Sequence, residues 1–279
     1  MKRKAGSSVC FHFFAGILAL IMLYPLLWMF SSSLKPTEQI FVDAANLIPK
    51  EIHLENYIKG WKGMGGISFG TFFKNSFVVA LFATIGSVAS SSIVAYGFSR
   101  IKFKYKNFWF AVMMGTMMLP EQILIVPQYL MFKTMRWTNT FLPLIVPFFC
   151  AMPFFVFLNM QFLRGLPIEL DEAAMIDGCT PLRTFFSVVL PIMKPTYISV
   201  GILETMWIWN DFLLPYLVLD LNKYKTISIA VQYMKGSYGR VDMGAIMAAL
   251  ILAVIPVIVF YLACQKHIIK GVAAGAVKG

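Results

Sequence analysis

The sequence is poor in charge for its length. Asp, Glu, Lys and Arg together make up 13% of its 279 residues, while 59% are hydrophobic. A soluble domain carries about a quarter charged residues, so a water-soluble domain is excluded. Long uncharged runs predict an all-α integral membrane protein, because a membrane β-barrel would show short alternating segments instead. The net charge of +11 does not indicate nucleic-acid binding, since basic residues commonly flank membrane helices.

Cysteine and histidine are also scarce, and no common catalytic motif is present. The four cysteines show no pairing pattern, so we expect no structural disulfide. The three histidines form no His-Glu-x-x-His zinc motif, and no nucleophile–base pattern supports an intramembrane enzyme. A Gly-x-x-x-x-Gly-Lys-Ser/Thr phosphate loop is missing, so the chain is not itself an ATPase. We therefore expect no catalytic residue, no metal and no cofactor bound by this chain.

What the sequence does contain is long apolar runs. A membrane helix needs about 20 apolar residues. The first run follows a basic N-terminus and is too long for a signal-peptide core, so we expect it to be retained. The result is a single transmembrane domain of residues 1–279 with a loop at 31–74 and a polar segment at 164–194. The expected helices lie at about 9–30, 75–99, 107–130, 138–163, 195–219 and 243–265.

Six helices place both termini on one side of the membrane. The short turn at 100–106 carries four basic residues, and dense basic charge in short loops marks the cytoplasmic side. We therefore expect both termini and the 164–194 segment in the cytoplasm, and the 31–74 loop outside. Helix 75–99 carries small residues at every fourth position, which predicts close helix packing. These are Ala83, Ser87, Ser91, Ala95 and Ser99.

The polar segment has the signals of two short helices joined by a sharp turn. Pro167 suits the first position of a helix, and carboxylates follow where the helix dipole favours them. Gly178 can take the left-handed conformation that ends a helix, and Thr180 can cap the next. Helical spacing predicts an exposed, shallow face that another protein can approach. It comprises Leu170, Ala173, Ala174 and Asp177. A simple connector explains the same local pattern.

Helix 195–219 carries polar groups in the membrane. Glu204, Trp207, Asn210 and Asp211 share one broad helical face. Polar side chains at such depth normally face a bundle interior or a water-filled cavity, so this face is a candidate solute path. Hydrogen bonding between helices explains it equally well. An ion-coupled secondary transporter or channel that uses intramembrane carboxylates, with Glu121 added to this set, stays an alternative.

One longer pattern in the polar segment is specific. Glu172-Ala173-Ala174, then Gly178, Val188 and Leu190-Pro191, resembles the EAA loop of permease subunits in binding-protein-dependent ABC importers. Val188 stands where isoleucine is common, and Cys179 where alanine is common. The resemblance continues along nearly the whole chain and is closest to the maltose-permease type of carbohydrate importer. It rests on Asn75-Ser76, residues 95–100, Trp209-Asn210-Asp211 and residues 271–279.

The resemblance implies a type I ABC importer permease fold with six transmembrane helices in a bacterial plasma membrane. It implies a second, related permease, two copies of a cytoplasmic ATPase that binds ATP and Mg, and an extracellular sugar-binding protein. It also implies that the chain forms half of the path for a sugar or oligosaccharide. The coupling residues toward the ATPase would be Glu172, Ala173, Ala174, Asp177 and Gly178.

Overall fold

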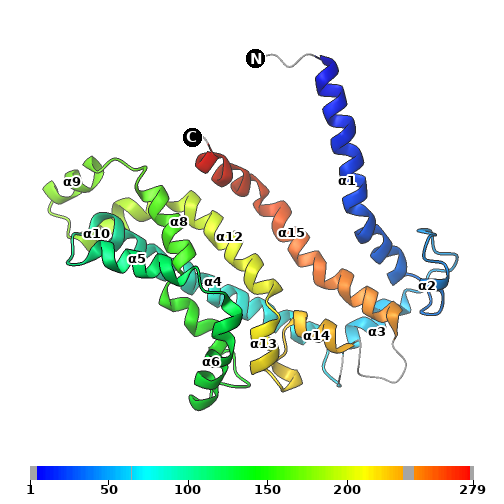
Figure 1. Ribbon diagram of the computed structural model, residues 1–279. Helices are drawn as coiled ribbons and strands as arrows, with labels where there is room; N and C mark the ends of the chain where they lie inside the picture. The colour runs from blue at the N-terminus through cyan, green and yellow to red at the C-terminus, as the bar shows by residue number, and fades with distance from the viewer. Residues whose placement is uncertain (1–4, 64, 235–241, 277–279) are drawn as a thin grey trace. The chain divides into compact units, whose positions relative to one another are not determined.

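The computed structural model describes residues 5–63, 65–234 and 242–276, and every regular element in these ranges is helical (Figure 1). The α-helices are α1 (Ala5–Ser33), α2 (Gln39–Val42), α3 (Glu55–Lys62), α4 (Phe69–Arg100), α5 (Lys106–Thr116), α6 (Glu121–Thr134), α7 (Leu142–Ile145), α8 (Pro153–Leu163), α9 (Glu169–Ile176), α10 (Pro181–Thr184), α11 (Leu190–Ile192), α12 (Lys194–Asn210), α13 (Leu213–Val218), α14 (Ile227–Met234) and α15 (Met243–Ala276). Three short helices of other types are η1 (Val146–Cys150), η2 (Phe185–Val189) and η3 (Asn222–Tyr224).

Within the described residues, the long helices account for up to six membrane spans. Four stretches are long and apolar enough to cross alone: Phe11–Ser33, Phe69–Arg100, Leu142–Leu163 and Met243–Lys266. Two bent helix pairs raise the number to six if each pair is one span. They are Lys106–Thr116 with Glu121–Thr134, bent by 96°, and Pro181–Ile192 with Lys194–Asn210, bent by 77°.

The chain divides into two compact units, of which the first comprises Met1–Gly70 and Ala230–Pro256. In it, α3 packs against the first turns of α15, where Gly60 lets the two backbones meet. The Asn56 amide donates hydrogen bonds to the Ser33 and Lys35 carbonyls at 2.9 and 2.8 Å. Asp242 caps α15, because its carboxylate accepts the Ala245 N–H at 3.1 Å. These contacts fix the loop after α1 to the start of α15.

The second unit comprises Thr71–Ile229 and Val257–Gly279, and α4 contributes many of its buried residues. Of the five residues of the predicted packing face, Ala83, Ser87, Ser91 and Ala95 are fully buried, whereas Ser99, near the end of α4, is only partly buried. Ser91 of this stripe and its neighbour Ser90 also satisfy backbone groups of the chain before α8. Ser90 Oγ donates to the Phe148 carbonyl and accepts the Ala151 N–H, both at 3.1 Å, and Ser91 Oγ accepts the Met152 N–H at 3.1 Å.

Three runs that the sequence analysis assigns to one membrane span each are divided into shorter helices. The 107–130 run divides into α5 and α6, and Pro120 is the extended residue that precedes α6. The 138–163 run divides into α7, η1 and α8, because Pro147 and Pro153 lack the N–H that a continuous helix needs. The 195–219 run ends α12 at Asn210, where Asp211 is extended, and resumes at α13.

The connection from α13 to α14 is held by side chains from other elements. Asn75, in α4, donates to the Lys223 and Lys225 carbonyls, both at 2.9 Å, and Ser76 accepts the Ile227 N–H at 2.9 Å. From the turn after α6, the Asn139 side-chain carbonyl accepts two backbone N–H groups, of Asp220 and Leu221. The residues between 218 and 228 therefore have a defined path although few of them are in a helix.

Candidate functional site

The polar segment folds as two short helices around a glycine turn. Glu169–Ile176 forms α9, and Asp177 is the C-cap residue of this helix. The Cys179 N–H donates to the Ala174 carbonyl at 2.9 Å and the Gly178 N–H donates to the Met175 carbonyl at 3.0 Å. This pair of bonds defines a Schellman motif, which requires a left-handed residue, and Gly178 has φ +79°. The predicted glycine turn is confirmed.

The next helix begins as the local rules predict, and it enters the core. Thr180 is extended, its hydroxyl accepts the Arg183 N–H at 3.4 Å, and Pro181 opens α10. Pro167, by contrast, lies two residues before α9 and not at its first position. Past α10 the chain continues through the π-helix η2 into α11. Phe185, Val189 and Met193 are buried against α4 and α8 with Ala95, Tyr96, Val156, Met160 and Leu163.

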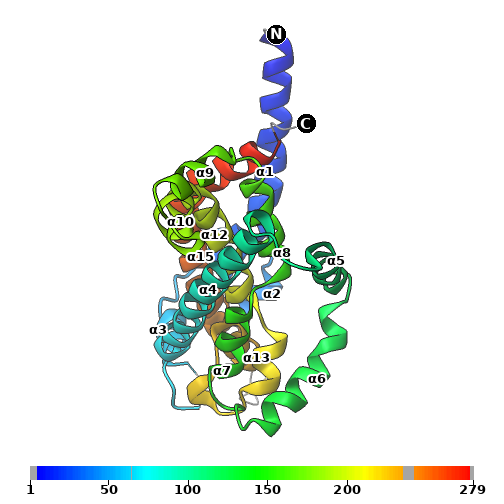
Figure 2. The same cartoon turned by 90° about the vertical axis from the view of Figure 1, so that its left-hand side faces the viewer.

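A buried ion pair fixes α9 from its other side. Arg100 Nε lies 3.0 Å from Asp171 Oδ2, and the two side chains are 11% and 6% exposed. Arg100 Nη2 also donates to the Leu163 and Leu166 carbonyls, at 3.2 and 2.9 Å. One guanidinium therefore joins the end of α4, the end of α8 and the start of α9, as its several donors allow. Figure 2 shows α9 and α10 together at one end of this unit.

The sequence analysis missed this pair. It assigned Arg100 to the basic turn and Asp171 to the helix dipole, since each residue has a sufficient local explanation. One signal was present, because Arg100 is the only arginine in a turn whose other basic residues are lysines. Arginine suits a buried site that must make several hydrogen bonds, whereas lysine suits a solvated surface.

The exposed face of α9 differs from the predicted one. Ala174 is only 5% exposed, so it does not belong to the outward surface. Asp171 and Ala174 lie three positions apart on one side of the helix, and the ion pair with Arg100 turns that side inward. The outward stripe has helical spacing and combines two carboxylates, a small residue and a large apolar one. It consists of Glu169, Glu172, Ala173 and Ile176, with the exposed Leu170 and Asp177 beside it.

The polar residues of α12 do not share one environment. Glu204 is 1% exposed and lies inside the bundle, whereas Trp207 is 52% exposed. The Trp207 ring packs against Phe154 and Phe155 of α8, with centroids 5.4 and 5.3 Å apart. Asn210 is exposed and donates to the Met206 carbonyl of its own helix at 2.7 Å. Of these residues, Trp207 and Asn210 are the accessible ones here.

Asp211 lies where α12 stops. Its backbone is extended, and its carbonyl accepts the Ser228 hydroxyl at 2.7 Å. Glu121 opens α6 and is exposed. Among the residues that the structure describes, no three His, Cys, Asp or Glu side chains come together as a metal site. The three carboxylates of the ion-coupled alternative come from different places: Glu204 lies within α12, whereas Asp211 at its end is within electrostatic range of Glu121 at the start of α6.

Comparison with known proteins decides the family. Residues 85–274 match the family described as binding-protein-dependent transport system inner membrane component. The chain belongs to this family. The probable ABC transporter permease protein YurM of Bacillus subtilis is 33% identical over 98% of this chain and 89% of its own length. The arabinooligosaccharides transport system permease protein AraQ of Halalkalibacterium halodurans is 31% identical over 100% of both chains.

A solved structure shares the fold. It is that of a bacterial ABC transporter involved in the import of the acidic polysaccharide alginate, with a TM-score of 0.81 at 19% identity. The match covers 95% of this chain and 99% of that chain. The importer-permease fold expected from the EAA pattern is confirmed. The permease is a multi-pass membrane protein and a transport subunit, not an enzyme, and such a subunit works with a separate ATPase and a substrate-binding protein.

Proposed function

We propose that the chain forms half of the membrane path of an ATP-driven importer of sugars or oligosaccharides. Its partners would be a second, related permease, two copies of a cytoplasmic ATPase, and an extracellular binding protein that delivers the sugar, in a bacterial plasma membrane. The names of two similar proteins support the carbohydrate class, since one relative is named for arabinooligosaccharides and the similar structure for alginate.

The observation that carries the coupling role is the rigid placement of α9 with its outward stripe. Glu172 and Ala173 face outward, while Asp171 is held by Arg100 and Gly178 fixes the turn. Ala174 acts from behind this surface, as a small residue that lets α9 lie close to the bundle. In this proposal ATP and Mg bind to the separate ATPase. The ATPase can move the permease only if its nucleotide-bound and nucleotide-free states differ in affinity for this surface.

Uptake in reconstituted vesicles tests the proposal against the ion-coupled alternative. The complete transporter should accumulate its sugar when ATP and the loaded binding protein are supplied, and it should continue after ionophores collapse all ion gradients. Accumulation that follows an imposed proton or sodium gradient without ATP would instead support a secondary transporter. The sugar that the cognate binding protein retains on purification would name the substrate.

Both ends of the chain are expected in the cytoplasm. In a cysteine-free background, single cysteines placed at Ser7 and Gly275 should stay unlabelled by a membrane-impermeant maleimide in intact cells. The basic 100–106 turn is expected to orient the six spans with both ends inside. Both positions should therefore react only after the membrane is permeabilised. Ready labelling of either position in intact cells would contradict this orientation.

Trp207 and Asn210 are expected to contact the solute. Aromatic faces suit the C–H surfaces of sugars, and the half-exposed Trp207 ring is supported from behind by two phenylalanines. Trp207→Ala should raise the uptake KM about tenfold, the equivalent of about 1.4 kcal/mol, while assembly with the ATPase is unchanged. Asn210→Ala should change sugar preference, and Trp207→Phe should keep most of the affinity. Unaltered uptake in both alanine variants would leave this face as a packing surface.

A further inference from the structure

Helix α3 contacts α15 near the first residues of the α15 span. A Cβ at Gly60 would lie 2.9 Å from the Ala245 carbonyl oxygen and 3.3 Å from the Ala249 nitrogen, so α3 touches the first turns of α15. The span within α15 is Met243–Lys266. Counting back from Lys266 the roughly 20 residues that a span needs places the edge of the hydrocarbon core near residue 247. The contact between α3 and α15 is therefore at that edge.

Three different sides of α3 are distinguished by their residues. Asn56 and Gly60 are buried and face α15 and the end of α1. Leu54, Ile58 and Trp61, spaced four and three apart, form an apolar stripe whose side chains are 64%, 61% and 48% exposed. The third side carries Glu55, Lys59 and Lys62. A helix with one side to protein, one apolar side and one charged side is suited to a membrane surface.

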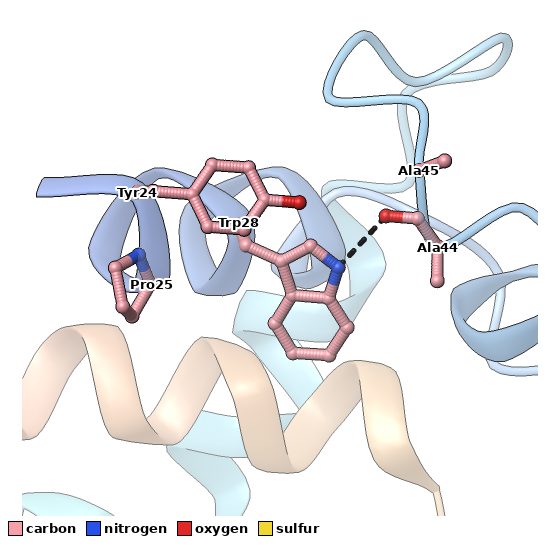
Figure 3. A pocket seen from close by; sticks show the side chains of 5 residues that line it. All are labelled: Tyr24, Pro25, Trp28, Ala44 and Ala45. Carbon is pink, nitrogen blue, oxygen red and sulfur yellow. Dashed lines mark hydrogen bonds between the residues drawn. The ribbon is translucent and has the colours of Figure 1, made fainter. Parts of the chain in front are cut away.

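The loop between α1 and α3 is attached to α1 by a second contact, at a similar depth along the membrane normal. The Trp28 indole donates to the Ala44 carbonyl at 2.9 Å, beside a hollow that Tyr24, Pro25 and Ala45 also line (Figure 3). Trp28 lies five residues before the end of the Phe11–Ser33 span, about 7.5 Å along the helix at 1.5 Å per residue. The buried Lys35 ammonium donates to the Asp43 and Asn46 carbonyls and holds the same turn.

This loop exposes large apolar side chains on either side of that attachment. Val42 and Ile48 are 88% and 84% exposed, and Phe41 and Ile52 are also exposed. The preceding helix α1 also exposes its apolar side chains, since its span is unburied within the described chain. Lysines and aromatic residues accompany it, as is typical of the headgroup region of a membrane. Irregular backbone is not tolerated deeper in lipid, so the headgroup–acyl boundary is the level at which this loop can lie.

We infer that residues 39–62, here called the collar, lie in the lipid interface of the leaflet that meets the Met243 end of α15. The occupant of the exposed apolar stripe is the lipid at the headgroup–acyl boundary, and the charged side of α3 faces headgroups and water. In the proposed orientation this is the outer leaflet. The lipid contact itself does not depend on the sugar or on the direction of transport.

Site-directed spin labelling of the assembled transporter in lipid nanodiscs tests the inference. Single labelled cysteines are placed at Ile58 and Ile48, with Glu55 as the matched control on the same helix, in a cysteine-free background. The ratio of collision rates with oxygen, which prefers lipid, and with nickel-EDDA, which prefers water, should be about tenfold higher at 58 than at 55. That factor corresponds to about 1.4 kcal/mol of partitioning.

Two other outcomes would overturn the inference. Equal ratios at 58, 48 and 55 would place the collar in water. Exclusion of both reagents at 58 and 48 would show that a protein partner, such as the second permease, covers the stripe.

A separate experiment uses brominated lipids, which quench the emission of nearby tryptophans. Quenching should be weaker in Trp61→Phe than in the parent protein, and an unchanged quenched fraction would contradict lipid contact at α3. None of these readouts involves transport, so their failure is distinct from failure of the proposed function.

Discussion

Replacing Gly178 by valine should abolish ATP-driven uptake while the protein still inserts into the membrane. Gly178 has φ +79°, and a Cβ there would meet no atom within 4 Å, so the effect comes from the backbone and not from a clash. The left-handed conformation costs an L-residue roughly 1–2 kcal/mol, and a β-branched residue avoids it more strongly. A cost of about 2 kcal/mol lowers the population of the turn about thirtyfold, and α9 loses its position. Uptake and membrane abundance are measured together.

Matched variants separate the turn from a general effect. Gly178→Asn should retain much more uptake, because asparagine tolerates the left-handed region. Gly115→Val, at a helical glycine whose Cβ position is also open, should transport normally. Glu172→Lys reverses an exposed charge on the outward stripe and should reduce uptake without changing membrane abundance. Normal uptake in both Gly178→Val and Glu172→Lys would mean that the segment is only a connector.

Removing either member of the Arg100–Asp171 pair should strongly destabilise the end of the permease that carries α9. Arg100→Ala leaves a buried carboxylate without its partner and removes the side-chain donor from the Leu163 and Leu166 carbonyls. Losing one member of a buried pair typically costs about 3–5 kcal/mol. We expect a lower thermal unfolding midpoint for the purified transporter, rapid proteolysis within residues 164–194, and loss of uptake.

The double variant Arg100→Met with Asp171→Leu is the informative control. Apolar residues of similar volume often replace a buried pair at little cost, so this variant should regain most of the unfolding midpoint lost in Arg100→Ala. Lys102→Ala removes an exposed charge from the same turn and should leave stability within about 0.5 kcal/mol of the parent. If Arg100→Ala behaves like Lys102→Ala, the pair does not hold α9.

Local signals in the sequence were sufficient to predict the glycine turn, the Thr180 cap and the small-residue face of α4. Each depends on backbone preferences or spacing within a few residues. The breaks are harder to predict, because proline has more than one role. Pro120 precedes a bend of 96°, whereas Pro127 lies inside α6 and Pro256 inside α15. Whether a proline breaks a helix depends on neighbours that supply hydrogen bonds to the freed groups, as Ser90 and Ser91 do before α8.

The orientation of side chains depended on contacts that are distant in sequence. Ala173 and Ala174 are adjacent and chemically identical, yet the first is exposed and the second is buried because Arg100 holds Asp171 from 71 positions away. Glu204 and Trp207 lie less than one turn apart, yet one is inside the bundle and the other half-exposed. Helical periodicity defines which residues share a side, but only the tertiary partners decide which side faces inward.

The way Asn75, Ser76 and Asn139 hold the chain between α13 and α14 has an evolutionary consequence. These side chains bind only backbone carbonyl and N–H groups of residues 220–227, which every amino acid except proline supplies in full. The path of this connection is therefore largely independent of the identity of its own side chains. Lineages can exchange the residues on it, and so adapt to a different neighbour or cargo, without rebuilding the framework that supports it.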